Sequence, residues 1–515
     1  MQTRLWGLAL APFVLACTSE NPPGGGPVSD GGGAEVLAEA ADGNATLDAT
    51  VAWDGARDGA PRDATTVPEA EADTGNDAPV DAALPDSAPN ADVAPANPDG
   101  APTGWISHPC SLPGSVQSTD GGKVVVPGGT TGPMGCAMGS SDLSFLSVPA
   151  GFCAHYFGNV GNARQIRFAP GGELFVASPT APTTSGGLCG RNEIVVLADD
   201  NGDGLADAPI TFLSGLPNTQ GLLFTNGYFY YQDGSQIMRV RYARGDRLPS
   251  GAAEKVADIT LSAVQDGFHW PKSMDVADDG TIYVANGGSQ SDICFTDGGS
   301  PDGGPLVRGA ILKLDGTPGG TPIVQGLRNP IALRCARGHN HCFGLELAKD
   351  YSGPTPGREK LFPIRPGDDW GFPCCASTNL PYTDVMPVPN CSGVATDTNS
   401  FLIGDTPFGV DFEPGMWPDP WKGRAYVAIH GVVAAWTGAR LVAIAMDPAT
   451  GLPLPSSTAN ASGSDTGAML DFALGWDNGK RENGRPTAIA FSSDGRLFLS
   501  NDTTGDIVWI APLGL

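Results

Sequence analysis

The sequence contains little positive charge and very little histidine. Its 515 residues include 29 Lys and Arg against 56 Asp and Glu, a net charge of −27, and six His. So acidic a chain repels phosphates, and we expect no nucleic-acid partner. None of the cysteine spacings matches a common zinc site, and histidine is too scarce to complete one. After the first 17 residues no run is long and apolar enough to span a bilayer, and helical periodicity is almost absent.

The first apolar run is typical of a leader. "MQTRLWGLALAPFVLAC" has one basic residue, an apolar stretch and small residues before Cys17, as in a secretory signal. "VLAC" is similar to the cleavage box of bacterial lipoproteins, whose cysteine becomes the lipidated N-terminus; the alternative is an ordinary signal peptide. Thr18 and Ser19 follow the cysteine, instead of the aspartate that retains such proteins in the inner membrane. We therefore predict a signal at 1–17, lipidation of Cys17, and an exported outer-membrane lipoprotein of the bacterial cell envelope.

Residues 18–104 are rich in Ala, Pro, Gly, Asp and Thr. From Ser19 to Gly104 they hold 17 acidic residues and two arginines, so 15 of the 27 net negative charges fall here. Such a segment cannot bury enough apolar surface to offset its chain entropy, and its like charges repel one another. We predict a disordered, extended tether. The acidity of the chain therefore says little about its active site.

Residues 105–515 form the predicted folded domain. Ten cysteines remain beyond Cys17. An even number in an exported chain indicates up to five disulfides, whose pairing the sequence does not give. Cys374 and Cys375 are adjacent and bond either to each other or to two different partners; we favour different partners.

One hairpin pattern recurs six times in this domain. Each copy has a short apolar strand, a turn rich in Gly, Asp or Asn, and a second apolar strand, as in "IRFAPGGELFVAS", "MDVADDGTIYVANG" and "IAFSSDGRLFLSND". The equivalent aromatic residues are Phe175, Phe229, Tyr283, Phe343, Tyr426 and Phe498. Compact four-stranded blades recur at about 40–50 residues, and these spacings are somewhat longer, as expected for blades with insertions. We predict an all-β fold, a six-bladed β-propeller. A β-sandwich is the alternative, but it would not repeat one hairpin six times.

Polar residues recur just before the first strand of the predicted blades. In a propeller these strands line the central channel, so the residues before them meet at one mouth. A mouth that gathers cations and an imidazole suits an anionic ligand and proton abstraction. Ordinary polar loops would explain any one of these residues, but the recurrence favours a site. The residues are Arg164, Gln220, His269, Lys272, Arg328, Asn329 and Arg485, with His430 reaching the same mouth from the end of a second strand.

Several of these stretches resemble one superfamily. "GNARQIRFAPGGELFVAS", "HWPKSMDVADDGTIYVANGG", "GLRNPIAL" and "GRPTAIAFSSDGRLFLSND" are similar to the sorbosone dehydrogenases and soluble glucose dehydrogenases, which have a pyranose-oxidising branch. The resemblance covers roughly residues 148–515. It implies a six-bladed propeller that uses pyrroloquinoline quinone (PQQ) and calcium to oxidise sugars.

The same resemblance implies roles for the mouth residues. His269 is the general base that takes the sugar hydroxyl proton while hydride passes to the quinone, and Arg328 stabilises the developing negative charge. Arg485 pairs with a cofactor carboxylate. The further residues expected at the cofactor are Gln220, Lys272, Asn329 and His430.

The chain also departs from the superfamily pattern. His430 replaces a cofactor-binding lysine, and Thr487 replaces a second arginine. The calcium-binding stretch is expected near Glu346 to Asp350, and "GDDWGFP" further on echoes the superfamily's loop. These departures bear on cofactor affinity and on the substrate.

A second metal candidate is "DDNGDGLAD", residues 199–207. Its side chains provide hard oxygen ligands around two glycines, as at the start of a calcium loop, although the closing glutamate is missing. The alternative is a tight turn, where Asp, Asn and Gly are favoured anyway. We weigh a structural calcium site and a plain turn evenly; the ligands would be Asp199, Asn201, Asp203 and Asp207.

Three functions follow as hypotheses. The first is a lipid-anchored, PQQ-dependent sugar dehydrogenase that passes electrons to an acceptor in the envelope. The second is a non-catalytic propeller that binds glycans or partner proteins. The third, a hydrolase such as a propeller lactonase, needs a ring of metal-binding carboxylates at the mouth, where only Glu346 comes close. His269, Arg328 and Asn329 together favour the first.

Overall fold

The computed structural model describes residues 109–126, 142–180, 189–259, 269–288, 309–349, 358–376, 380–382, 388–396, 398–432, 438–458, 465–477 and 483–515. The predicted leader, the lipidation site at Cys17 and the tether lie outside these residues. The described elements are β-strands and one short 3-10 helix, η1 (Pro109–Ser111). No helix among them is long and apolar enough to cross a membrane.

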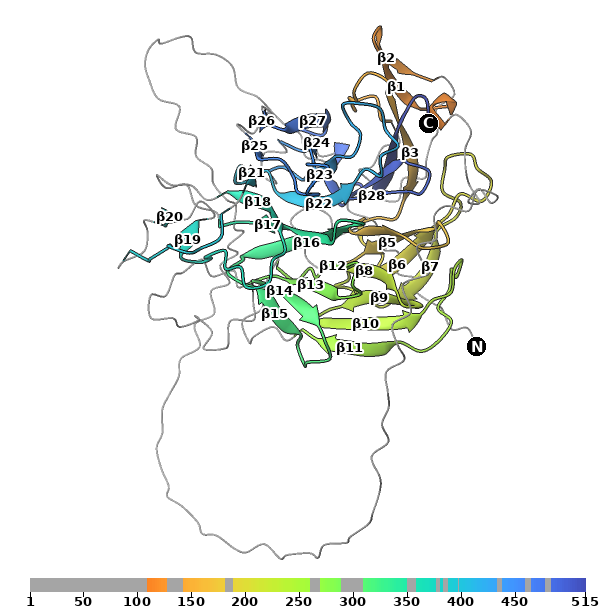
Figure 1. Ribbon diagram of the computed structural model, residues 1–515. Helices are drawn as coiled ribbons and strands as arrows, with labels where there is room; N and C mark the ends of the chain where they lie inside the picture. Colours follow the sequence, from red (N-terminus) through yellow and green to blue (C-terminus); the bar gives the residue numbers. More distant parts are fainter. Residues whose placement is uncertain are drawn as a thin grey trace, which may run out of the picture. The chain divides into compact units, whose positions relative to one another are not determined.

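Six of the seven sheets that the described strands form are the blades of a β-propeller (Figure 1). Blade 1 holds β4 (Ile166–Phe168), β5 (Leu174–Ser178), β6 (Glu193–Leu197) and β7 (Ile210–Ser214). Blade 2 holds β8 (Leu222–Thr225), β9 (Tyr228–Asp233), β10 (Gln236–Arg241) and β11 (Glu254–Asp258). Blade 3 holds β12 (Met274–Val276), β13 (Ile282–Asn286), β14 (Ala310–Leu314) and β15 (Thr321–Val324).

The other three blades are more elaborate. Blade 4 holds β16 (Asn329–Ala336), β17 (His341–Leu347), β18 (Glu359–Pro363) and β21 (Asn399–Phe401), with β25 (Ser456–Thr458) and β26 (Asp465–Gly467) at its outer edge. Blade 5 holds β22 (Pro407–Phe412), β23 (Ala425–Ile429), β24 (Arg440–Ile444) and β27 (Met469–Ala473). Blade 6 holds β28 (Pro486–Phe491), β29 (Leu497–Asn501) and β30 (Asp506–Pro512), followed by β3 (Phe152–Asn159), β1 (Val116–Thr119) and β2 (Gly122–Val125). A separate hairpin joins β19 (Cys375–Ala376) to β20 (Leu380–Pro381).

The first strands of the blades close into a ring. They contact one another in the order β4, β8, β12, β16, β22, β28 and back to β4. The ring is completed by strands from both ends of the domain, because β3 pairs antiparallel with β30 in blade 6. Such closure leaves no open seam between the first and last blades. The predicted six-bladed propeller is therefore confirmed.

The recurring aromatic residue of the sequence pattern packs between neighbouring blades. Phe175, on the second strand of blade 1, lies 4.9 Å from Phe224 at the inner strand of blade 2. Phe498 of blade 6 lies 5.0 Å from Phe168 of blade 1 in the same way. Blades 4 and 5 repeat the arrangement with Phe412 and Phe491 of the following blades. Ring pairs at these separations stabilise beyond their area burial, which explains why the hairpin pattern is visible in the sequence.

Disulfides join several of the ten cysteines of the domain. Three of them link Cys110 to Cys153, Cys335 to Cys342, and Cys375 to Cys391. Cys374 is also disulfide-bonded, so the adjacent cysteines 374 and 375 have different partners, as predicted. Cys136 and Cys294 lie outside the described residues.

Candidate functional site

The predicted site residues meet at one mouth of the channel. Apart from His430, each mouth residue named from the sequence precedes the first strand of its blade or, like Asn329, opens it. His430 directly follows β23, which runs antiparallel to β22 and so ends at the same mouth. Below the mouth, a cavity in the channel is lined by residues on or next to the first strands of all six blades, among them Gln165, Gln220, Ser273, Leu333, Phe408 and Thr487.

His269 is buried at this mouth with one ring nitrogen engaged. Its Nδ1 lies 2.9 Å from the carbonyl oxygen of Gly288, to which a neutral imidazole donates its proton. Nε2 is then the unprotonated nitrogen, and no hydrogen bond within the described part of the chain involves it. Burial, followed by the nearby charge of Arg328 and then that of Lys272, lowers the pKa of His269 to about 3. The ring is therefore neutral at physiological pH and holds an acceptor lone pair at Nε2.

Gly287 brings His269 and Asn329 together. A Cβ at Gly287 would lie 2.5 Å from the carbonyl oxygen of His269 and 3.1 Å from Oδ1 of Asn329. Any larger residue would force these groups apart. Oδ1 of Asn329 is buried and has no hydrogen-bond partner among the described residues. A buried polar atom left without a partner costs free energy, and this one lies beside His269 at the mouth.

Arg328 is half-buried beside this pair. Its Nη1 donates to the carbonyl oxygen of Ala348 at 3.1 Å, and its backbone N–H donates to Oε1 of Glu346 at 2.5 Å. The other carboxylate oxygen of Glu346 forms a buried ion pair with Lys360. Both carboxylate oxygens of Glu346, the one candidate ligand of the lactonase hypothesis, thus contact protein groups. Asp350, the far end of the expected calcium stretch, lies outside the described residues.

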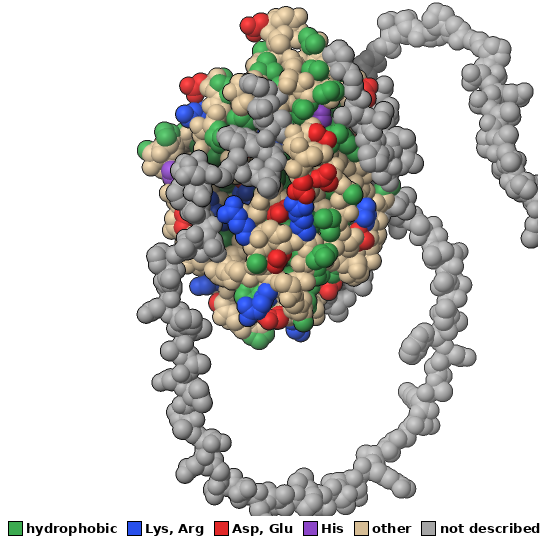
Figure 2. Space-filling view, turned by 90° about the vertical axis from the view of Figure 1, so that its right-hand side faces the viewer, with side chains coloured by type: hydrophobic (Ala, Val, Ile, Leu, Met, Phe, Trp, Pro, Cys, Tyr) green, Lys and Arg blue, Asp and Glu red, His purple; other side chains and the backbone are tan. Residues whose placement is uncertain are grey.

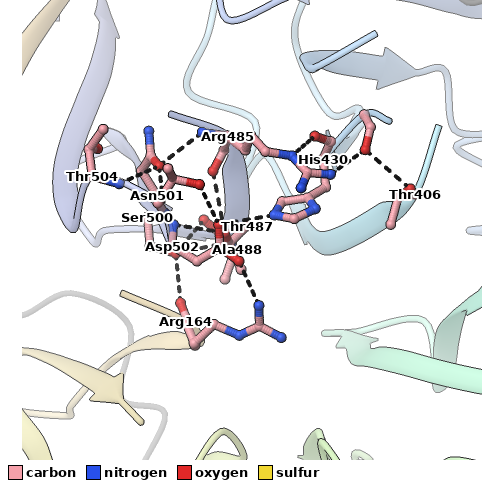
Figure 3. A network of polar contacts seen from close by, with 12 residues as sticks. Arg164, Thr406, His430, Arg485, Thr487, Ala488, Ser500, Asn501, Asp502 and Thr504 are labelled. Atoms are coloured by element: carbon pink, nitrogen blue, oxygen red, sulfur yellow. Dashed lines mark hydrogen bonds and ion pairs between the residues drawn. The ribbon is translucent and has the colours of Figure 1, made fainter. Parts of the chain in front are cut away.

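The opposite side of the mouth is a buried polar network centred on Asp502 (Figure 3). Oδ2 of Asp502 accepts from Nη1 of Arg164 at 2.7 Å, and Oδ1 lies 3.1 Å from Nε2 of His430. Nε of Arg164 donates to Gln220 at 3.2 Å. Arg485 donates from Nε to the carbonyl oxygen of His430 at 2.7 Å and from Nη2 to that of Gly431. The network joins residues of blades 1, 2, 5 and 6.

Charges in this network are set by burial and by one another. Burial and then the charge of Arg485 lower the pKa of His430 to about 4, although Asp502 acts in the opposite direction. Burial alone would raise the pKa of Asp502, but His430, Arg164 and Arg485 outweigh it and hold the pKa below its usual range. Burial lowers the pKa of Arg485 to about 10, so it remains a cation at neutral pH. His430 is neutral there, and with Nε2–H donating to Asp502 its Nδ1 is a buried acceptor with no partner in the described residues.

Further along the first strands, away from the mouth, charged groups link the blades around the channel. Arg167 lies 3.3 Å from Asp275, and Arg334 lies 3.8 Å from the other oxygen of the same carboxylate. Arg334 also makes two hydrogen bonds, at 2.7 and 2.8 Å, to Asp411. Backbone groups complete the chain of contacts, which runs through Arg167, Leu222, Asp275, Arg334, Asp411 and Phe491, one residue from each blade. We name it the channel ring.

The acidic stretch 199–207 lies between β6 and β7, at the end of blade 1 away from the mouth. Its side chains serve the turn: Asp199 accepts from the backbone N–H of Asp203 and Gly204, each at 3.0 Å, and Asn201 accepts from Asp203 at 2.9 Å. Asp207 accepts from the N–H of Asp200 at 2.8 Å. Among the described residues, no group of three or more His, Cys, Asp or Glu is placed to hold a metal ion. These contacts are those of a tight turn, and a structural calcium site in this stretch stays a prediction.

The outer surface has no comparable gathering of cations on the face that Figure 2 shows, where Lys and Arg are interspersed with Asp and Glu among the described residues. Exposed pairs such as Arg247 with Asp200, at 2.6 Å, are of this kind.

Sequence reasoning missed Asp502. A signal for it was present, because Asp502 directly follows the second strand of blade 6 just as His430 follows that of blade 5. Extending the search from residues before the first strands to residues after the second strands would have included it.

Comparison with known proteins supports the same architecture. Residues 141–314 match a family model described as a domain of unknown function (DUF7133). No curated protein matches the chain. Among solved structures, the iodide structure of the Trichoderma reesei carbohydrate-active enzymes family AA12 aligns with a TM-score of 0.57 and 17% identity, covering 71% of this chain and 97% of that chain.

Two further structures give nearly the same result. The calcium structure of the same Trichoderma reesei family has a TM-score of 0.56 and 16% identity over 71% of this chain and 97% of its own. The holo form of the PQQ domain of pyranose dehydrogenase from Coprinopsis cinerea has a TM-score of 0.55 and 16% identity over 73% of this chain and 99% of its own. This chain has their fold. The six-bladed fold that the sequence motifs predict is thus also the fold of these three structures.

Proposed function

We propose that this protein is a PQQ-dependent dehydrogenase that oxidises an aldose or a related sugar. The observation that carries the proposal is the state of His269: a buried, neutral imidazole whose Nδ1 is tied to Gly288 and whose Nε2 is unengaged among the described residues, next to Arg328 and Asn329. A base with its tautomer fixed in this way is what proton abstraction requires. Pure binding needs no such arrangement.

The residues present suit PQQ in charge. The cofactor is a polycarboxylate, and the mouth holds the cations Arg164, Lys272, Arg328 and Arg485, with Asp502 as the counter-charge to Arg164 and Arg485. On the side of blades 5, 6 and 1, Nε and Nη2 of Arg485 are bound to backbone carbonyls. Lys272, Arg328 and Asn329 would hold the cofactor from one side of the mouth, and Arg485 would act from the other side through its charge.

Two of the structures that share this fold support PQQ and calcium as the two ligands, since one is the holo form of a PQQ domain and another is a calcium structure. Bound PQQ supplies an ortho-quinone that accepts hydride, which no side chain can do. His269 would take the proton of the reacting hydroxyl at Nε2 while the carbon that bears this hydroxyl loses hydride, so that a carbonyl forms. Arg328 stabilises the negative charge that develops nearby. Asn329 and Gln220 orient what is bound.

We further propose that the chain acts at the cell envelope. Lipidation at Cys17 would anchor it to the outer membrane, the tether would hold the propeller away from the lipid, and an envelope acceptor would receive the electrons. Cys17→Ser tests the anchor: it should release the protein from the membrane fraction and leave sugar oxidation unchanged.

The decisive experiment is a dye-reduction assay. The purified chain is loaded with PQQ and calcium and offered a panel of aldoses. We expect sugar-dependent dye reduction that requires PQQ and falls by about 10²-fold or more in His269→Ala, the range typical of a lost general base. Absence of turnover with saturating PQQ and every sugar would favour the binding-module alternative instead.

A further inference from the structure

Glu346 and Lys360 form a buried ion pair in blade 4. Glu346 lies on β17 and Lys360 on β18, directly opposite each other in the antiparallel register. Both side chains are almost fully buried, and the Lys360 ammonium contacts Oε2 of Glu346. A buried ion pair costs more to desolvate than an apolar pair of the same volume, so it is weak evidence for stability. Its position next to the mouth points to another use.

The second oxygen of Glu346 holds the turn that precedes β16. Glu346 is opposite Pro330 in the pairing of β16 with β17, and the register shifts immediately after this proline. Proline has no N–H to donate to the ladder. Oε1 of Glu346 instead accepts the backbone N–H of Arg328 at 2.5 Å. The carboxylate thus fixes the backbone at the point where Arg328 and Asn329 enter the mouth.

The same turn is held from its other side by the "GDDWGFP" loop. The Lys360 ammonium lies 5.2 Å from the ring centroid of Trp370. The backbone N–H of Trp370 donates to the carbonyl oxygen of Gln325 at 3.0 Å. Phe372 donates to the carbonyl oxygen of Gly326 at 2.9 Å. A Cβ at Gly326 would lie 2.1 Å from the side chain of Asp369, so the two segments pack without spare room. Residues 325–328 are therefore clamped between this loop and Glu346.

We propose that Glu346 and Lys360 are a positioning pair for Arg328 and Asn329. Lys360 fixes the carboxylate of Glu346 in one orientation, and Glu346 fixes the amide of Arg328, so that both mouth side chains leave the backbone in a set direction. Glu346 then acts through its hydrogen bond and not as a metal ligand or a base. The effect on cofactor binding rests on the function proposed above, whereas the effect on the turn does not.

Two double variants separate the hydrogen bond from the charge. E346Q/K360M removes both charges and keeps an acceptor for the Arg328 amide, whereas E346L/K360M removes the acceptor as well. The measurement is hydrogen exchange of the amides in 325–329 of the full chain, with the amide of Cys335, which donates to Asp275 at 3.0 Å, as the internal reference.

We expect wild-type protection of 325–329 in E346Q/K360M and exchange at least about tenfold faster in E346L/K360M, with Cys335 unchanged in both. Should E346L/K360M fail to fold, E346D serves in its place, because the shorter side chain keeps its charge near Lys360 but no longer reaches the Arg328 amide; the same faster exchange is expected. Equal protection of 325–329 in E346L/K360M (or E346D) and in wild type would overturn the proposal.

Equilibrium binding of PQQ to the same variants provides the second readout. E346Q/K360M should bind within about threefold of wild type, and E346L/K360M about tenfold or more weakly, at unchanged Tm relative to E346Q/K360M. Equal affinity of the two double variants contradicts a positioning role. If wild type itself does not bind PQQ, the proposed function fails, but the exchange measurement still decides whether the pair positions Arg328.

Discussion

Arg164 and Asp502 are 338 residues apart in the sequence, and Nη1 of Arg164 donates to Oδ2 of Asp502 at 2.7 Å. The contact joins the first blade to the last at the mouth of the channel, where both side chains are buried. Asp502 also lies 3.1 Å from His430 of blade 5. One carboxylate therefore fixes groups from two other blades in the region where we propose that the cofactor binds.

The first prediction concerns this carboxylate. Asp502→Asn leaves the buried guanidinium of Arg164 without this counter-ion, and breaking a buried pair in this way costs about 3–5 kcal/mol. Urea unfolding should show a loss of that order. The matched control is Asp200→Asn, which removes the half-exposed partner of Arg247 and should have little effect, as is usual for surface ion pairs. Equal losses in the two variants would contradict our account of the network.

The second prediction concerns the channel ring. Asp411→Ala leaves Arg334 without its two hydrogen bonds and the N–H of Phe491 without its acceptor. We expect a loss of about 3 kcal/mol in the free energy of unfolding. Glu254→Ala, which removes the exposed partner of Arg239, is the control. Because the ring lies away from the mouth, PQQ affinity of the folded variant should stay within about threefold of wild type; a large loss of affinity at unchanged stability would refute this placement.

The third prediction concerns pH. The pKa of His269 is about 3 in the folded chain, against an ordinary value of 6.5. As pH falls below 6.5, the unfolded chain takes up a proton that folded His269 does not, so wild type loses about 1.4 kcal/mol of stability per pH unit from this residue. His269→Asn lacks this contribution. As the pH falls from 7.5 to 5, the free energy of unfolding of wild type should therefore decrease more than that of His269→Asn. Parallel curves would mean that His269 titrates normally.

The fourth prediction concerns Gly287. The φ angle of Gly287 lies outside the positive range that favours glycine, so the backbone conformation allows any residue. A Cβ there would lie 2.9 Å from the Cβ of His269 and 3.1 Å from Oδ1 of Asn329. Gly287→Ala should therefore displace both groups and weaken PQQ binding by about tenfold or more. Gly251→Ala meets no atom within 4 Å and is the control, with no expected change. A Gly287→Ala variant that binds PQQ as wild type does would show that the two side chains do not form one site.

The propeller could be predicted because its repeat is local. Each hairpin has its own turn and strands, and the aromatic residue on the second strand packs against the next blade, as Phe175 does on Phe224. The residues at the mouth could be predicted from the same repeat, because His269 and Arg328 occupy equivalent places before the first strands of their blades. A position that recurs from blade to blade can therefore be recognised in the sequence.

The network inside the mouth could not be predicted in the same way. The engagement of Asp502 with Arg164, and of Glu346 with Lys360, depends on side-chain directions and on how neighbouring strands pair. The acidic stretch 199–207 shows the opposite case, because turn formation and calcium binding call for the same residues. There the composition is ambiguous, and Asp199 accepts hydrogen bonds from two backbone N–H groups of the turn.

The most direct test is a single-turnover experiment with PQQ-loaded protein. Wild type and His269→Ala are brought to equal PQQ occupancy in the presence of calcium and without an electron acceptor, and mixed with the sugar that best supports dye reduction. Reduction of the bound cofactor is followed by its absorbance. We predict rapid reduction in wild type and reduction slower by about 10²-fold or more in His269→Ala at the same occupancy. Equal rates in the two proteins would contradict the assignment of His269 as the base.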